Sequence, residues 1–255
     1  MTQGGTSSSS VPELPPPLPG GFTLDDPRTG RLAVYEGGPR AAGPHAPLLL
    51  VHSVNAAASA FEVRPLFQHY AASRPTYALD LPGFGLSDRS DRRYSPRLMT
   101  DAVLAVVDEI RRRHAGAQID ALAVSLATEY LARAAYEDPA PYRSLALVSP
   151  TGFNGTRRRD APIGSTREVP GVHAVLSWAP WSQGLYRLLT RPGTIRYFLE
   201  RTFGQKKIDE AMWAYDVLTV QQPGAKNAPL YFLSGSLFSG DVTTLYESLA
   251  MPVWM

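Results

Sequence analysis

Four short apolar segments, separated by segments with helical periodicity, constrain the fold of this chain more than any other feature. They are APLLLVHS (46–53), PTYALDLPG (75–83), IDALAVS (119–125) and YRSLALVSP (142–150). A continuous apolar run of this length is expected of a strand that is covered on both faces, as in a parallel sheet. Strands that alternate with helices need right-handed crossovers, which place helices on both faces. The sequence therefore predicts a mostly parallel, doubly wound α/β sheet.

The segments between these strands carry helix and turn signals. Ser95 and Pro96 suit the cap and first position of a helix over 96–114, and its apolar residues recur at helical spacing. Further helices are expected from near Pro65 and over 126–137. Two alternating segments, GFTLDD and RLAVYEG, flank a turn at 27–30 and predict an antiparallel hairpin at a sheet edge.

The composition divides the chain into three parts. Residues 1–20 are mostly Gly, Ser and Pro, and they predict a disordered leader, with a ligand for a polyproline-binding groove as the lesser alternative. Residues 21–153 and 239–255 are expected to form the α/β core. Residues 154–238 contain aromatic, helix-like segments without a clear buried strand, and they predict a helical cap whose aromatic residues mostly form its own core.

Several classes of protein are disfavoured by what the sequence lacks. The net charge is +2 with interspersed signs, so no basic stripe indicates nucleic acid. The chain has no cysteine, which excludes disulfides, thiol nucleophiles and Cys-ligated metals. It has no apolar run of about 18 residues, no secretory signal, and no nucleotide or zinc motif. We therefore expect a cytoplasmic protein without a membrane span, a metal or a cofactor, whose oligomeric state is left open.

Reactive side chains in an open parallel sheet belong at the carboxyl ends of the strands. Three such ends are suggestive: 52–55, 80–85 and 123–127. At the third, the strand must turn sharply into a helix, so the residues two before and two after the turn must be small. Ala123 and Ala127 meet this requirement, and Ser125 would then lie beside a helix N-terminus that favours negative charge.

Three segments together carry a family resemblance. AVSLA (123–127), LLLVHSVNAAASAF (48–61) and ALDLPGFGLSD (78–88) are similar to the nucleophile elbow, the oxyanion loop and a common loop of the α/β-hydrolase superfamily. The chain resembles the capped, serine-nucleophile, esterase- and lipase-like branch over about residues 21–255. It departs from the family pattern at Ala123 and Ala127, where glycine is usual, and at Ser53, which also replaces a glycine.

The resemblance implies a role for each matching residue. Ser125 is the implied nucleophile toward an ester or related acyl bond of a small-molecule substrate, with no cofactor. The backbone N–H groups of Val54 and Leu126 are the implied oxyanion hole. His52 and Asp80 are implied to order their loops rather than to act in catalysis. Peptidase, C–C hydrolase and acyltransferase chemistry use the same serine and stay open.

A catalytic serine needs a base and an orienting acid, and these decide between two readings of the chain. In the resembled family both follow the cap, whereas all five histidines of this chain, His45, His52, His69, His114 and His173, precede the end of the predicted cap. We therefore expect the triad Asp and His, and the last strands of the sheet, beyond Met255, so that the chain is a truncated enzyme. The alternative is a catalytically inactive relic or interaction module, and the coding sequence after Met255 separates the two.

Overall fold

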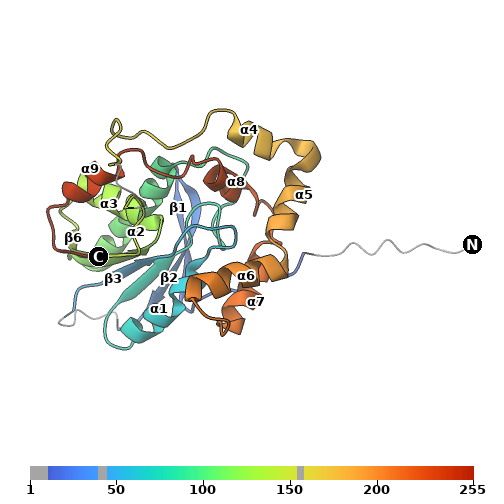
Figure 1. Cartoon of the computed structure of the whole chain (residues 1–255). Coiled ribbons are helices and arrows are strands. Elements are labelled where there is room, and N and C mark those ends of the chain that lie inside the picture. The colour runs from blue at the N-terminus through green and yellow to red at the C-terminus, as the bar shows by residue number, and fades with distance from the viewer. Residues whose placement is uncertain (1–10, 40–44, 154–157) are drawn as a thin grey trace, which may run out of the picture.

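The computed structural model describes residues 11–39, 45–153 and 158–255. The chain forms a central sheet with helices around it (Figure 1). The described strands form one sheet of seven in the order β1-β2-β4-β3-β5-β6-β7. Their bounds are β1 Gly21–Asp26, β2 Gly30–Gly37, β3 Leu48–Val51, β4 Thr76–Leu79, β5 Ile119–Val124, β6 Tyr142–Val148 and β7 Val253–Trp254.

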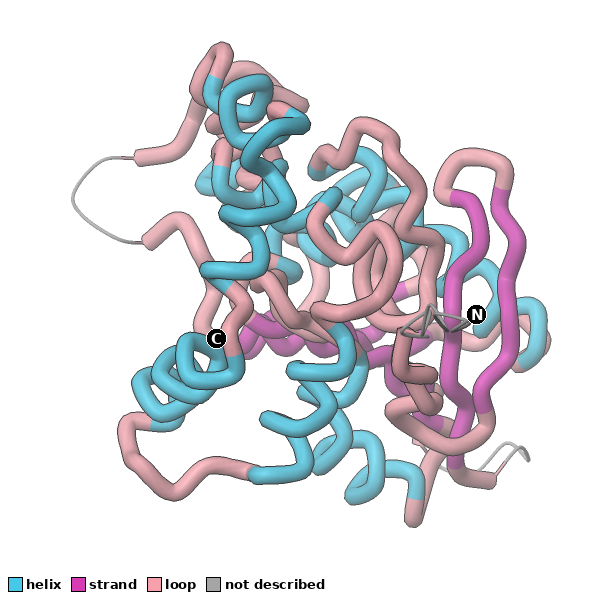
Figure 2. Tube along the Cα trace, turned by 90° about the vertical axis from the view of Figure 1, so that its right-hand side faces the viewer, coloured by secondary structure: helices cyan, strands magenta, loops and turns pink. Residues whose placement is uncertain are grey.

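The sheet is parallel except at one edge. β1 pairs antiparallel with β2, and β2 pairs antiparallel with β4, so the predicted edge hairpin is confirmed (Figure 2). The pairs β4–β3, β3–β5, β5–β6 and β6–β7 are all parallel. The mostly parallel, doubly wound α/β sheet predicted from the alternating pattern is therefore confirmed.

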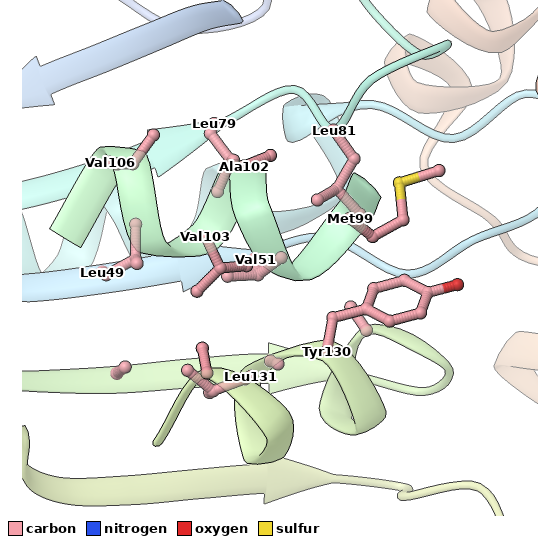
Figure 3. Close-up of a cluster of buried hydrophobic side chains, with 14 of the residues drawn as sticks. Leu49, Val51, Leu79, Leu81, Met99, Ala102, Val103, Val106, Tyr130 and Leu131 are labelled. Carbon is pink, nitrogen blue, oxygen red and sulfur yellow. The ribbon is translucent and has the colours of Figure 1, made fainter. Parts of the chain in front are cut away.

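Helices cover both faces of the sheet, as the fully buried strands require. Along β3, Leu49 and Val51 pack into a core with helices α2 (Pro96–Arg113) and α3 (Ala127–Glu137), part of which Figure 3 shows. Leu48 and Leu50 face the other side, where they pack with α1 (Arg64–Ala71). This alternation is the two-residue period of a strand.

The helix predicted over 96–114 is confirmed, with the predicted cap and first-turn residues. Ser95 is its N-cap and its hydroxyl accepts a hydrogen bond from the Leu98 N–H at 3.3 Å. Pro96 occupies the first turn, where a missing N–H costs nothing. The helix ends at Arg113, one residue before the predicted end, and Gly116 follows in the left-handed region.

The described residues after β6 are rich in helices. They form α4 Val172–Ser177, α5 Ala179–Leu189, α6 Pro192–Phe203, α7 Glu210–Thr219 and α8 Asn227–Leu233, followed by α9 Val242–Glu247. These helices occupy the region where we predicted a cap. Its carboxyl part packs on the core, however, because Ala228 and Leu237 lie within the α2–α3 cluster. None of the helices in the described ranges is long and apolar enough to cross a bilayer.

Residues 11–18, here called the N-terminal strap, differ from the predicted disordered leader. Leu14 and Leu18 are buried, at 6% and 3% exposure. The Tyr215 hydroxyl donates to the Pro15 carbonyl, and the Gln222 amide donates to the Pro12 carbonyl, each at 2.9 Å. Proline restricts the free chain, so ordering this segment costs less entropy than ordering a Gly/Ser tract. Residues 1–10 of the predicted leader lie outside the described residues.

Candidate functional site

Ser125 lies at the turn between β5 and α3. Its φ of 53° is in the left-handed region, which residues other than glycine rarely adopt. The Ser125 N–H donates to the Val148 carbonyl of β6 at 2.8 Å. The Ser125 carbonyl accepts from the Thr128 N–H at 3.1 Å and from the Thr128 hydroxyl at 2.6 Å. The strained turn is therefore fixed by its own backbone groups, and the half-buried side chain is not used to hold it.

The two alanines around this turn fill the narrow space between strand and helix. Ala123 and Ala127 are both 0% exposed. A larger side chain at either place would push α3 from β5, because buried positions are close-packed. Alanine therefore satisfies the steric requirement for which the resembled family usually has glycine.

The loop after β3 begins beside the elbow, because Val51 pairs with Ala123 across β3 and β5. His52 is wholly buried at the start of this loop. Its Nε2 accepts the Leu81 N–H at 3.0 Å, so Nδ1 carries the proton and donates to the Ser53 carbonyl at 2.6 Å. With both ring nitrogens occupied, His52 cannot accept a proton from Ser125. These contacts support the predicted loop-ordering role.

Three backbone N–H groups lie in the loop after β3 and at the elbow, and only one of them has a hydrogen-bond acceptor among the described residues. The Ser53 N–H donates to Glu62 Oε2 at 2.7 Å. Within the described part of the chain, no protein group accepts the N–H of Val54 or Leu126. These are the two amides that the family resemblance implies as oxyanion donors. Glu62 was not among the predicted site residues, although the Ser59-x-x-Glu62 spacing of a capping box could have indicated a local amide acceptor.

Asp80 is wholly buried, and both carboxylate oxygens accept hydrogen bonds. Oδ1 accepts the Ala60 N–H at 2.7 Å, while Oδ2 accepts the Tyr35 hydroxyl at 2.7 Å and the Leu86 N–H at 2.9 Å. A side chain at Gly85 would overlap the Asp80 carboxylate. Asp80 therefore ties its own loop to the oxyanion-loop side of the sheet, which agrees with a structural role.

None of the histidines, all of which lie in the described ranges, hydrogen-bonds Ser125. His114 Nε2 pairs with the Tyr77 hydroxyl at 2.9 Å, and burial lowers the pKa of its imidazole. His173, in α4, stacks on Tyr231 with ring centroids 3.6 Å apart. Among the described groups, Ser125 thus has no base in hydrogen-bond contact.

Sequence reasoning also missed a buried polar cluster along α3. Glu129 is 0% exposed; its carboxyl accepts the Thr151 hydroxyl and the Ser239 N–H, at 2.5 and 2.6 Å, and burial raises its pKa. Arg133 forms a buried ion pair with Asp241 at 2.6 Å. These contacts fix the segment that returns from the cap against the helix that follows Ser125. No local pattern marks them, because their partners are about 20 to 110 residues apart in sequence.

The aromatic residues of the predicted cap are divided between interior and surface. Tyr186 and Tyr215 are buried, whereas others are largely exposed, so the expectation that most form the cap's own core is wrong for them. The exposed ones are Trp178, Trp181, Tyr197, Phe198 and Phe203.

Comparison with known proteins agrees with this geometry. A model of the alpha/beta hydrolase family matches residues 48–249. A comparison with curated protein sequences gives no significant match. The fold is similar to that of the N-formylmaleamic acid deformylase Nfo of Pseudomonas putida, with a TM-score of 0.59 and 18% identity over 91% of this chain and 79% of that one.

Two further solved structures share the fold. The epoxide hydrolase CorEH has a TM-score of 0.66 and 18% identity over 91% of this chain and 80% of its own. The serine hydrolase CarC, involved in carbazole degradation, has a TM-score of 0.64 and 13% identity over 91% and 78%. At these identities the likeness concerns the fold alone, whereas the family match covers most of the chain. With its strand order, its elbow and that match taken together, the chain belongs to the α/β-hydrolase family.

Proposed function

We propose that this protein is a hydrolase that cleaves an ester or related acyl bond of a small molecule through an acyl-enzyme on Ser125, with a base that the described residues do not supply. The observation that carries the proposal is the left-handed backbone of Ser125 at the turn from β5 into α3, together with a Leu126 N–H that no described group accepts. Serines that only cap helices here are extended, with φ of −151° at Ser95 and −166° at Ser59. A serine that only begins a helix has no reason to adopt a conformation that costs about 1–2 kcal/mol.

The proposed chemistry assigns one task to each group. The Ser125 hydroxyl oxygen attacks the acyl carbon, and the substrate carbonyl oxygen gains negative charge. Collapse of this intermediate breaks the bond to the leaving group, which departs with a proton, and water then hydrolyses the acyl-enzyme and restores the serine. The N–H groups of Val54 and Leu126 receive that oxygen, and the N-terminus of α3 adds a favourable field. His52 and Asp80 hold the loop that carries Val54. Support for these donors is that no described group uses either amide.

The proton of Ser125 must pass to a base, and this is the component that the described residues do not supply. Both nitrogens of His52 are occupied, and no other histidine contacts Ser125. The assignment of a triad histidine and acid therefore stays a prediction.

The bond that is cleaved is the least constrained part of the proposal. The structural neighbours named above act, by their names, as a deformylase, an epoxide hydrolase and a serine hydrolase. Serine at the elbow, rather than aspartate, favours acyl chemistry over epoxide opening, because epoxide hydrolysis in the resembled family proceeds through an ester on a carboxylate nucleophile.

Labelling with an activated fluorophosphonate, read by intact mass, tests the nucleophile. In a form of the protein that contains the base, we expect one adduct on the unaltered sequence and none on Ser125→Ala. Ser149→Ala is the matched control, because Ser149 also has a left-handed backbone, with φ of 50°, at the end of the adjacent strand. Ser149→Ala should label like the unaltered protein. An adduct that persists in Ser125→Ala would remove Ser125 as the nucleophile.

A second candidate function is a catalytically inactive interaction module on the same fold. The absence of a described base at Ser125 favours it. This candidate predicts no adduct on the unaltered protein and no turnover of a panel of activated aryl esters. Turnover that depends on Ser125 would exclude it.

A further inference from the structure

A cavity among the described residues lies away from Ser125. It has a volume of about 840 Å³ and is bounded by α5, the α5–α6 link, the end of α7 and the α7–α8 link. Val11 and Pro12 of the N-terminal strap complete one wall. Figure 1 shows the start of the described chain, in blue, near α5 and α6. Neither the elbow nor the oxyanion loop lines this cavity, so it is separate from the proposed catalytic site.

The charges on the cavity wall all have one sign. Arg187, Arg191 and Lys226 line it, and none of the described lining residues is acidic. The ion pairs of the cap involve other cations: Arg196 pairs with Glu200 and Glu210, and Arg64 of α1 pairs with Asp209. Lys226 instead donates to the Ser182 hydroxyl at 3.0 Å, which leaves its charge uncompensated by any described carboxylate. Three cations around one cavity favour an anion, and guanidinium groups suit the planar carboxylate in particular.

The rest of the wall combines apolar residues with polar ones such as Gln183, Gln221 and Gln222. Val217, Val220 and Ala225 contribute aliphatic surface, and Val220 and Ala225 belong to a small buried cluster with Tyr186. A cavity of several hundred Å³ with apolar walls and a few polar groups is typical of sites for small organic ligands. The combination fits a molecule with a carboxylate at one end and a hydrocarbon chain or ring at the other.

We propose that this cavity between α5 and α7 is a binding site for an amphipathic organic carboxylate, distinct from the Ser125 site. An occupant would contact Tyr186, whose hydroxyl donates to the Ala56 carbonyl at 3.1 Å. Ala56 lies in the loop that carries Val54. Tyr186 thus lines the proposed site and also hydrogen-bonds the loop of the proposed oxyanion hole.

Isothermal titration calorimetry of the 255-residue chain with decanoate and with decanol tests the proposal. Both probes are used below the concentrations at which they aggregate. We expect one decanoate per chain and at least tenfold weaker binding of decanol, because a charge-assisted hydrogen bond is lost. Binding is read directly, so Ser125→Ala should bind decanoate as tightly as the unaltered chain. The result therefore does not depend on whether Ser125 reacts.

Variants locate the site. Lys226→Met and the pair Arg187→Gln with Arg191→Gln should each weaken decanoate binding by on the order of tenfold. Arg201→Gln is the control, since Arg201 is an exposed cation on α6 that does not line the cavity, and it should change nothing. Val11→Glu, at a half-exposed wall position, should also weaken binding, whereas Val11→Lys should not. Circular dichroism melting confirms that each variant is folded.

Three outcomes would overturn the proposal. Equal binding of decanol would show that only apolar adsorption is measured. Loss of binding in Arg201→Gln as large as in the cavity variants would indicate general surface charge. Unchanged binding in the folded cavity variants would place decanoate elsewhere, including at the Ser125 site.

Discussion

At Ser125 the chain holds a backbone conformation that a glycine would hold at lower cost. The turn is kept by Val148 and Thr128 through backbone atoms of Ser125, so those contacts do not depend on its side chain. The backbone strain at Ser125 therefore does not depend on its side-chain hydroxyl. Ser149 carries the same strain, so the strain alone does not mark a nucleophile; at Ser125 it coincides with the start of α3 and with a Leu126 N–H that no described group accepts.

Replacing Ser125 by glycine should stabilise the protein while abolishing fluorophosphonate labelling. Relief of the left-handed strain, about 1–2 kcal/mol, is partly offset by the greater freedom of glycine in the unfolded chain, about 0.5–1 kcal/mol. We expect a net gain of up to about 1.5 kcal/mol in urea unfolding. Ser149→Gly should give a similar gain without affecting labelling. A less stable Ser125→Gly would contradict the strain argument.

Asp216 is a buried carboxyl in α7, 6% exposed, whose pKa is raised to about 8 by burial and by the nearby Glu62. Because the folded-state pKa lies above that of the unfolded chain, its contribution to stability is present below about pH 4 and is lost as the pH rises toward 8. Each pKa unit corresponds to about 1.4 kcal/mol.

Asp216→Asn should therefore be more stable than the unaltered protein, by a margin that grows between pH 4 and pH 8. Urea unfolding at intervals across this range measures the margin. Asp25→Asn, at an exposed position of the edge hairpin, controls for loss of one charge and should show no such trend. A margin that is constant with pH would argue against an uncharged Asp216 in the folded protein.

At the scale of elements, local sequence was sufficient wherever local interactions decide the structure. Ser95 and Pro96 marked the start of α2, and the apolar runs marked β3 to β6, because caps and burial on both faces are properties of neighbouring residues. Ala123 and Ala127 marked the elbow for the same reason. The position of Ser125 in the fold was thus predictable, although its reactivity was not.

Other elements depend on partners that are distant in the sequence. The strap was expected to be disordered because prolines and serines bury little, yet Leu14 and Leu18 find apolar surface on the folded body. In the sequence, nothing distinguishes Glu129 and Asp241 from other charged residues. Their partners, Ser239 and Arg133, become neighbours only in the folded protein. The exposed aromatic residues of α5 and α6 likewise could not be assigned to interior or surface from their spacing alone.

The Arg133–Asp241 pair links α3 to the segment before α9, and both side chains are almost fully buried. Asp241→Asn keeps an acceptor for the Gly164 N–H, which donates to Oδ2 at 2.8 Å, but leaves Arg133 without a counter-charge. We expect a loss of about 3–5 kcal/mol. Adding Arg133→Met should recover most of this loss, because the unpaired buried charge is then removed. Equal stability of the single and double variants in urea unfolding would argue against that explanation.

At the scale of the whole molecule, the two faces of the sheet carry separate apolar clusters. Leu18 of the strap belongs to the α1 side, where it packs with Tyr35 and Phe67. Leu18→Ala should cost about 2–4 kcal/mol through lost burial and the cavity that remains. Val11→Ala, at a position 50% exposed, should change the free energy of unfolding by less than about 0.5 kcal/mol. Guanidinium unfolding measures both. Equal effects would mean that the strap is not anchored at Leu18.

The path of the strap also determines how the molecule would respond to pulling. A load applied at the amino end reaches the hydrogen bonds from Gln222 to Pro12 and from Tyr215 to Pro15 before it reaches the edge strand β1. The strap would therefore separate from the helical region around α7 while the sheet is still intact. A force–extension measurement should show the loss of these strap contacts at a lower force than the unfolding of the sheet.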